Sequence, residues 1–109
     1  MITNKKILVF APHTDDGELG CGGSIAKFIE DGNRVMCVAF SIAEDSVPNG
    51  FPKDALAHEF TNAMQTLGLH KEDIQYFKFR VRHFLELRQE ILQTMIDIRK
   101  SFNPDLVFI

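Results

Sequence analysis

Short apolar runs alternate with longer amphipathic segments along the chain, and this alternation restricts the fold more than any other feature. The runs are continuous, as in strands buried on both faces of a sheet, and span residues 6–11, 34–40, 74–79 and 105–109. The segments expected to be helices span residues 19–31, 53–67 and 83–102. The order βαβαβαβ predicts an α/β fold with a parallel sheet and right-handed crossovers.

A Rossmann-like strand order of 3-2-1-4 is the arrangement that we expect for this sheet. Ligands of such folds bind at the carboxyl ends of the strands, at the switch point beside strand 1. The loop that leaves strand 1 begins at Pro12 and is therefore the first place to look for function. The crossovers leave the third helix alone on one face and an apolar edge at 105–109. We therefore expect an incomplete domain, or a homo-oligomer that forms through the edge of the fourth strand.

Length and charge exclude several classes of protein. A chain of 109 residues, 45% of them hydrophobic, suffices for one core and predicts a single domain over residues 1–109. The 12 Lys and Arg against 15 Asp and Glu give a net charge of −3, which argues against nucleic acid as a partner. No apolar run approaches the roughly 20 residues that span a bilayer. Two cysteines are too few for a disulfide scaffold, so we expect a cytoplasmic protein.

The loop after the first strand concentrates ionisable groups, because His13, Asp15, Asp16 and Glu18 fall within six positions. Like charges this close need hydrogen bonds or a cation to compensate them. One turn can aim His13 and Asp16 at a single ion, and mixed nitrogen and oxygen ligands suit Zn²⁺ or another first-row divalent metal. Asp15 would then be free to act as a base. A helix cap is the competing role for Asp15 or Asp16, but the combination with His13 favours the metal site.

Other sites fit the sequence less well. A dinucleotide site is the nearest rival, because glycines follow strand 1, and Glu44 and Asp45 follow strand 2. These glycines, at positions 17, 20 and 22, do not form a G-x-G-x-x-G pattern, and the loop carboxylates would repel a pyrophosphate. The sequence has no Gly-Lys-Ser/Thr after these glycines, which excludes a P-loop. It also has no Asp at the end of strand 3, which a phosphoacceptor receiver domain needs. The glycines at 20, 22 and 23 would instead let the backbone approach the site and the next helix.

This loop resembles the signature of the LmbE-like (PIG-L type) zinc-dependent N-deacetylases. The signature reads H-P-D-D-E-x-x-G-x-G-G, and residues 13–23 read HTDDGELGCGG. Two weaker matches keep register with the family. Residues 59–68 fit its E-x3-A-x3-L-G helix end, and residues 88–92 and 103–108 resemble its R-Q-E-I-L and N-P-D-L-V-F segments. The resemblance thus covers nearly the whole chain.

The resemblance implies that His13 and Asp16 are zinc ligands and that Asp15 is the general base. The fold would be the amino-terminal half of the LmbE-like domain, and the substrate a small molecule, an N-acetylated amino-sugar conjugate. The family's third zinc ligand is a His in a D-x-H-x-D-H motif that shortly follows the N-P-D-L-V-F strand, and this sequence ends before it. An N-deacetylase is therefore the predicted function. The alternative is a truncated, non-catalytic module that acts through oligomerisation.

Three positions depart from the family pattern. Thr14 replaces the usual Pro, and Gly17 stands where the family has Glu, with Glu18 one position later. Leu56 occupies a position at which many members carry an Arg that contacts substrate. The Thr14 difference is expected to be harmless, and the other two concern substrate recognition rather than the metal ligands.

The other histidines, arginines and cysteines are expected to be structural or exposed. His58 lies off the apolar stripe of its helix, His70 lies in a connecting loop, and His83 would cap the long helix or be solvated. None of these three is expected to bind the metal. Arg80 and Arg82 are expected on the surface, with contact to an anionic substrate as the alternative. The two cysteines, at 21 and 37, are expected to pack inside, with an approach to the metal as the alternative for Cys21.

Overall fold

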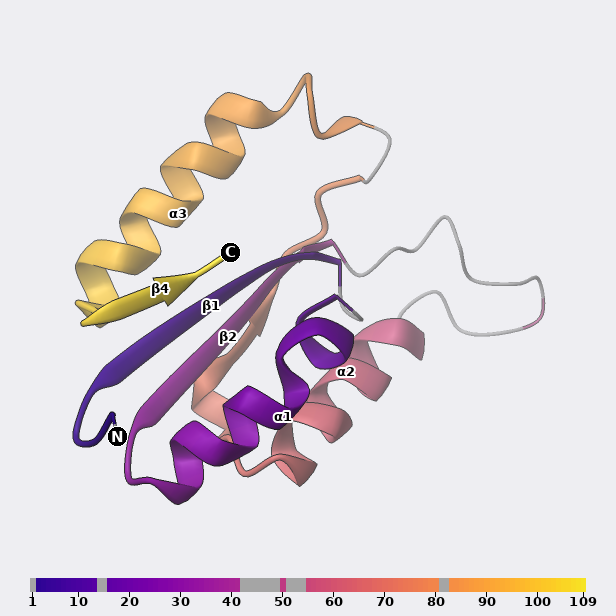
Figure 1. Ribbon diagram of the computed structural model, residues 1–109. Coiled ribbons are helices and arrows are strands. Elements are labelled where there is room, and N and C mark those ends of the chain that lie inside the picture. Colours follow the sequence, from indigo (N-terminus) through magenta and orange to yellow (C-terminus); the bar gives the residue numbers. More distant parts are fainter. Residues whose placement is uncertain (1, 14–15, 42–49, 51–54, 81–82) are drawn as a thin grey trace.

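The computed structural model describes residues 2–13, 16–41, 50, 55–80 and 83–109, and for residues 12–13 and 16–21 it describes the backbone alone. Figure 1 shows the order of the elements along the chain. The strands are β1 (Lys6–His13), β2 (Arg34–Ser41), β3 (Ile74–Tyr76) and β4 (Leu106–Phe108). The helices are α1 (Asp16–Glu30), α2 (Ala55–Thr66), the 3₁₀ turn η2 (Lys71–Asp73) and α3 (Arg88–Phe102).

Within the described residues, the four strands form one parallel sheet in the order β3-β2-β1-β4. Its centre is the long ladder between β1 and β2, in which Ile7 pairs with Val35 and Ala11 with Ala39. The sheet order and the alternation of strands with helices confirm the α/β fold with the 3-2-1-4 order that the sequence predicts. The carboxyl end of β1 therefore lies at the switch point, with β2 on one side and β4 on the other.

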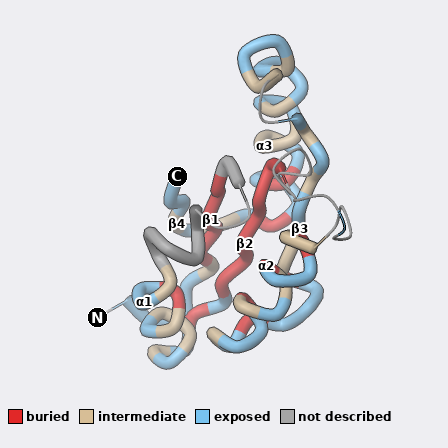
Figure 2. Tube along the Cα trace, turned by 90° about the vertical axis from the view of Figure 1, so that its right-hand side faces the viewer, coloured by how far each residue is buried: buried red, intermediate tan, exposed pale blue. Residues whose placement is uncertain are grey.

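Helices α1 and α2 cover one face of the sheet, and α3 lies on the other, as expected (Figure 1). The core cluster under α1 and α2 consists of Ile7, Val9, Ile25, Val35, Cys37, Ala39, Phe60, Met64 and Leu69. The cluster under α3 consists of Leu8, Phe10, Met36, Val38, Phe40, Ile98 and Phe102. Because successive residues of a strand point to opposite faces, the continuous apolar runs of β1 and β2 supply both clusters. Figure 2 shows the buried residues gathered along these two strands.

Polar side chains fasten the elements together at the amino end of the sheet. Asn33 is buried; its Oδ1 accepts a hydrogen bond from the N–H of Lys5 at 3.0 Å, and its Nδ2 donates to the carbonyl of Phe28 at 2.9 Å. The buried Asp73 carboxylate accepts two hydrogen bonds from the Arg34 guanidinium, at 2.7 and 3.1 Å. These bonds and the charge of Asp73 raise the pKa of Arg34. The end of the sheet opposite the candidate site is thus rigidly cross-linked.

Strand β3 is shorter than predicted because its ladder with β2 loses register. The N–H of Phe77 donates to the carbonyl of Ala39 at 2.8 Å, and the N–H of Phe79 donates to that of Phe40 at 3.0 Å. The segment after β3 therefore advances by two residues while β2 advances by one, as in a β-bulge. The predicted strand over 74–79 consequently ends at Tyr76, although Phe77 and Phe79 still pack against the cluster under α3.

Helix α3 begins five residues later than predicted, at Arg88 instead of residue 83. The preceding residues form tight turns, in which the N–H of His83 bonds to the carbonyl of Arg80, and that of Leu87 to the carbonyl of His83. Phe84 still packs against the sheet, so the apolar periodicity identified an inward-facing residue but placed the helix start too early. Helix α1, in contrast, begins three residues earlier than predicted.

Strand β4 forms an apolar edge with exposed side chains. Val107, Phe108 and Ile109 expose 41%, 38% and 91% of their surface, and Figure 2 shows this strand beside the buried β1. The ring of Phe108 stacks on that of Phe28 in α1, with centroids 5.6 Å apart. Among the described residues, no helix is long and apolar enough to cross a membrane.

Candidate active site

The backbone brings two of the predicted site residues to the switch point. His13 is the last residue of β1, and Asp16 is the first residue of α1. His13 pairs in the parallel ladder with Ser41, the last residue of β2. All three positions belong to the carboxyl edge of the sheet, where α/β folds bind their ligands.

The side chains of His13 and Asp16, and the whole of Asp15, lie outside the described residues. The predicted zinc ligands and general base therefore stay predictions. Within the part of the chain that the structure describes, no group of three His, Cys, Asp or Glu side chains is placed to hold a metal ion. The dinucleotide hypothesis used Glu44 and Asp45, which also lie outside the description, as does most of the loop after β2.

The early start of α1 gives Asp16 a second favourable environment. A helix amino terminus carries a partial positive charge and unpaired N–H groups, so it stabilises a carboxylate in the first turn. The position of Asp16 suits the metal-ligand hypothesis and an interaction with the helix dipole. The N-cap position itself is residue 15, which lies outside the described residues. The predicted close approach of Gly22 and Gly23 to the next helix is wrong. A Cβ atom on Gly22 would lie 4.0 Å from Leu67 Cδ1, which is ordinary contact, and one on Gly23 would meet nothing within 4 Å.

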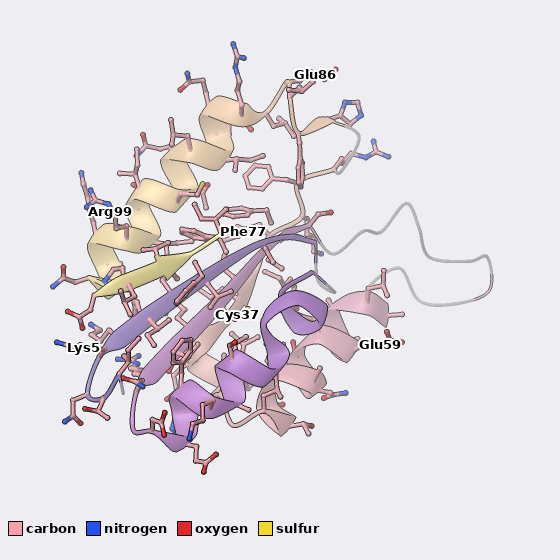
Figure 3. The ribbon with its side chains drawn as sticks, viewed as in Figure 1. Lys5, Cys37, Glu59, Phe77, Glu86 and Arg99 are labelled. Atoms are coloured by element: carbon pink, nitrogen blue, oxygen red, sulfur yellow. The ribbon has the colours of Figure 1, made fainter. Side chains whose placement is uncertain are left out.

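Two of the three remaining histidines are placed as the sequence predicts, whereas His83 does not cap the long helix, because the N-cap residue of α3 is Leu87. His58 and His70 are exposed, on α2 and just before η2. His83 is half-buried, and its Nδ1 lies 3.0 Å from the Oε2 atom of Glu86. Figure 3 labels Glu86 at the turn before α3, on the outside of the molecule. His83 therefore pairs with a surface carboxylate.

The cysteine and arginine predictions are confirmed where the structure describes the residues. Cys37 is fully buried in β2, between the sheet and the helices α1 and α2 (Figure 3). Arg80 is exposed. The side chain of Cys21 and the whole of Arg82 are not described.

Ser41 is a buried polar residue that the sequence motifs do not single out. The apolar pattern ends at Phe40 and predicts a loop from Ser41 onward, whereas the structure has Ser41 as the last residue of β2, with only 3% of its surface exposed. The sequence offers no signal that separates Ser41 from the loop residues after it, because serine is common in loops.

An apolar groove of about 180 Å³ lies between the sheet and α3. Its lining consists of Phe10, Ala11, Phe40, Phe84, Ile91, Met95 and Ile109. None of these side chains is polar, so the groove offers packing surface without a catalytic group.

A family model described as PIG-L, GlcNAc-PI de-N-acetylase, matches residues 8–109. The chain belongs to the PIG-L family. The match includes the loop from His13 to Gly23, and it confirms the LmbE-like resemblance. PIG-L proteins are generally metal-dependent, which agrees with the cofactor class expected from this loop.

Solved structures of similar fold include relatives of this PIG-L chain. The conserved protein TT1542 from Thermus thermophilus is 28% identical, with a TM-score of 0.75 over 94% of this chain and 44% of its own. The N,N′-diacetylchitobiose deacetylase from Pyrococcus horikoshii is 25% identical, with a TM-score of 0.71 over 94% of this chain and 39% of its own. The chain thus spans less than half the length of either protein.

The same fold also occurs in a protein with different chemistry. GalB, the 4-carboxy-2-hydroxymuconate hydratase from Pseudomonas putida KT2440, has a TM-score of 0.79 over 94% of this chain and 45% of its own, at 22% identity. At this identity the similarity concerns the fold alone. The function of the PIG-L chain has to be argued from its site.

Proposed function

We propose that this chain is part of a metal-dependent hydrolase of the deacetylase type, which removes an N-acetyl or similar acyl group from an amino-sugar conjugate. Membership of the PIG-L family supports the proposal. So does a structural relative at 25% identity that deacetylates N,N′-diacetylchitobiose. The observation that carries it is the position of His13 and Asp16, which end β1 and begin α1 at the switch point.

The predicted donor set suits a zinc ion. His13 offers an imidazole nitrogen and Asp16 a carboxylate oxygen, both of which are common zinc ligands. Catalytic zinc sites usually have three protein ligands, and the family pattern puts the third after the strand that corresponds to β4. Because β4 runs parallel to β1 and pairs with it, a residue there would reach the same edge of the sheet. When bound, the metal would act as a Lewis acid that polarises the amide carbonyl.

Asp15 would move the proton of the reaction. Its carboxylate would accept a proton from the attacking water as the new C–O bond forms at the amide carbon. The same carboxyl group would then donate this proton to the amine nitrogen as the C–N bond breaks. The products would be acetate, or the corresponding carboxylate, and a free amino sugar.

Release of acetate from N,N′-diacetylchitobiose and from N-acetylglucosaminyl conjugates tests this proposal in the full natural polypeptide. We expect activity that is lost on chelation and restored by zinc. Asp15→Asn should lower kcat by about 10²- to 10⁴-fold, because it removes the general base. Asp31→Asn is the matched control, since Asp31 pairs with Lys27 at 3.2 Å at the other end of α1.

Two outcomes would contradict the proposal. One is activity that survives both chelation and Asp15→Asn. The other is a protein that releases no acetate from any of these substrates with zinc present, which would favour the non-catalytic module.

A further inference from the structure

Ser41 is a buried hydroxyl that the core does not require. The strand before it is apolar from Val35 to Phe40, and every residue from Val35 to Ser41 is buried. Removing a hydroxyl from water without a hydrogen bond is unfavourable. Among the described residues, no buried side-chain nitrogen or oxygen lacks a hydrogen-bond partner, and Ser41 does have an interaction partner. A buried hydroxyl at the carboxyl end of β2 therefore needs a hydrogen-bond partner there.

The other described buried polar residues serve a different part of the molecule. Asn33 and Asp73 fasten the amino end of the sheet through their bonds to Lys5, Phe28 and Arg34. Of the buried polar side chains that the structure describes, only Ser41 lies at the carboxyl edge. Ser41 therefore does not take part in the hydrogen bonds that connect the elements at the amino end of the sheet.

Strand alternation assigns Ser41 to the face that α1 covers. Cys37 and Ala39 belong to the core cluster under α1 and α2, and Phe40 belongs to the cluster under α3. Ser41 follows the odd-numbered positions, so its hydroxyl lies on the side of α1 and α2. Its Cα pairs with that of His13 on the neighbouring strand, about 4.8 Å away in a parallel ladder. The buried hydroxyl thus lies beside the end of β1, on the face of the sheet that α1 covers.

We propose that Ser41 is a positioning residue, whose hydroxyl fixes the end of β1 so that His13 is oriented for the metal. This inference rests on the proposed function. Groups that orient metal ligands from outside the coordination sphere typically change metal affinity 10- to 100-fold when they are removed. The hydroxyl would act through His13 and would touch neither the metal nor the substrate.

The pair Ser41→Thr and Ser41→Val tests the hydroxyl at nearly constant shape. Thr keeps the hydroxyl and Val replaces it with a methyl group, and both are β-branched residues that suit a strand. We expect Ser41→Thr to keep the zinc dissociation constant within about threefold of the wild type, and Ser41→Val to raise it by about 10-fold or more. Zinc affinity of the full natural polypeptide would be measured by competition with a chromophoric chelator, and its folding by thermal unfolding of the metal-free protein.

Thr61→Val is the matched control. The Thr61 hydroxyl donates to the carbonyl of Ala57 at 3.0 Å within α2. Thr61 does not take part in the β1–β2 ladder that holds His13, so this change should leave zinc affinity unaltered. Equal zinc affinities in Ser41→Thr and Ser41→Val would overturn the positioning role, whether or not Ser41→Val unfolds at a lower temperature. If the wild type itself binds no zinc, the proposed function fails first, which separates the two failures.

Discussion

At the amino end of the sheet, the side chain of Asn33 connects three segments of the chain. Its amide makes three hydrogen bonds: Oδ1 accepts from the N–H of Lys5, and Nδ2 donates to the carbonyls of Ile2 and Phe28. These bonds join the residues before β1, the end of α1 and the start of β2. All the partners are backbone groups, so a shorter side chain cannot replace the contacts.

Asn33→Ala should lower the free energy of unfolding by about 2–3 kcal/mol, because it removes three part-buried hydrogen bonds. Urea denaturation monitored by circular dichroism measures this loss. The control Asn62→Ala changes an exposed residue of α2 and should stay within about 0.5 kcal/mol of the wild type. A similar loss in both variants would show that the Asn33 bonds do not stabilise the fold.

The candidate site residues differ in how far the sequence reveals them. The pattern His-x-Asp-Asp after an apolar run is enough to predict His13, Asp15 and Asp16 as site residues. Ser41 has no such pattern, because serine is common in loops and the sequence does not show where the strand ends. Its burial and its pairing with His13 come from the β1–β2 ladder alone.

At the scale of elements, two glycines close the reversals that return the helices to the sheet. Gly32 follows α1 and Gly68 follows α2, with φ angles of +90° and +108°. This left-handed region is favourable for glycine and costly for other residues. The two sites differ in their surroundings. A Cβ at Gly32 would meet nothing within 4 Å, whereas one at Gly68 would lie 3.2 Å from Ile29 Cγ2.

Gly68→Ala should therefore destabilise the protein more than Gly32→Ala. In both variants an alanine must adopt the left-handed conformation, which costs about 1–2 kcal/mol of folding free energy. Only Gly68→Ala also forces the side chain of Ile29 to move. The comparison needs the free energy of unfolding of the two variants under the same conditions. If Gly68→Ala loses no more free energy of unfolding than Gly32→Ala, the Ile29 side chain moves aside at little cost and this prediction is wrong.

Element boundaries are the part of the fold that the sequence predicts least well. The apolar periodicity identifies Phe84 as an inward-facing residue, but it cannot show that residues 83–87 form turns rather than helix. Likewise, Phe77 and Phe79 continue the apolar pattern of β3 after the ladder has lost register. In both cases the packing follows the pattern, whereas the backbone hydrogen bonds depend on neighbouring elements.

At the scale of the whole molecule, the topology was predictable because few arrangements satisfy the alternation. Continuous apolar strands require cover on both faces, and right-handed crossovers then fix which helices share a face. The exposed apolar edge formed by β4 is a consequence of the same order. Homo-oligomerisation through this edge and a cytoplasmic location stay predictions.

An oligomer would appear in sedimentation analysis and would dissociate when Val107→Lys places a charge on the strand.

Zinc stoichiometry is the most direct measurement of the proposed centre. We expect one zinc ion per molecule of the full natural polypeptide, and loss of that ion in both His13→Ala and Asp16→Ala. The variant His58→Ala, which changes an exposed histidine of α2, should keep its zinc. A wild type that binds no zinc, or variants at His13 and Asp16 that bind it as tightly as the wild type, would contradict a metal-dependent hydrolase.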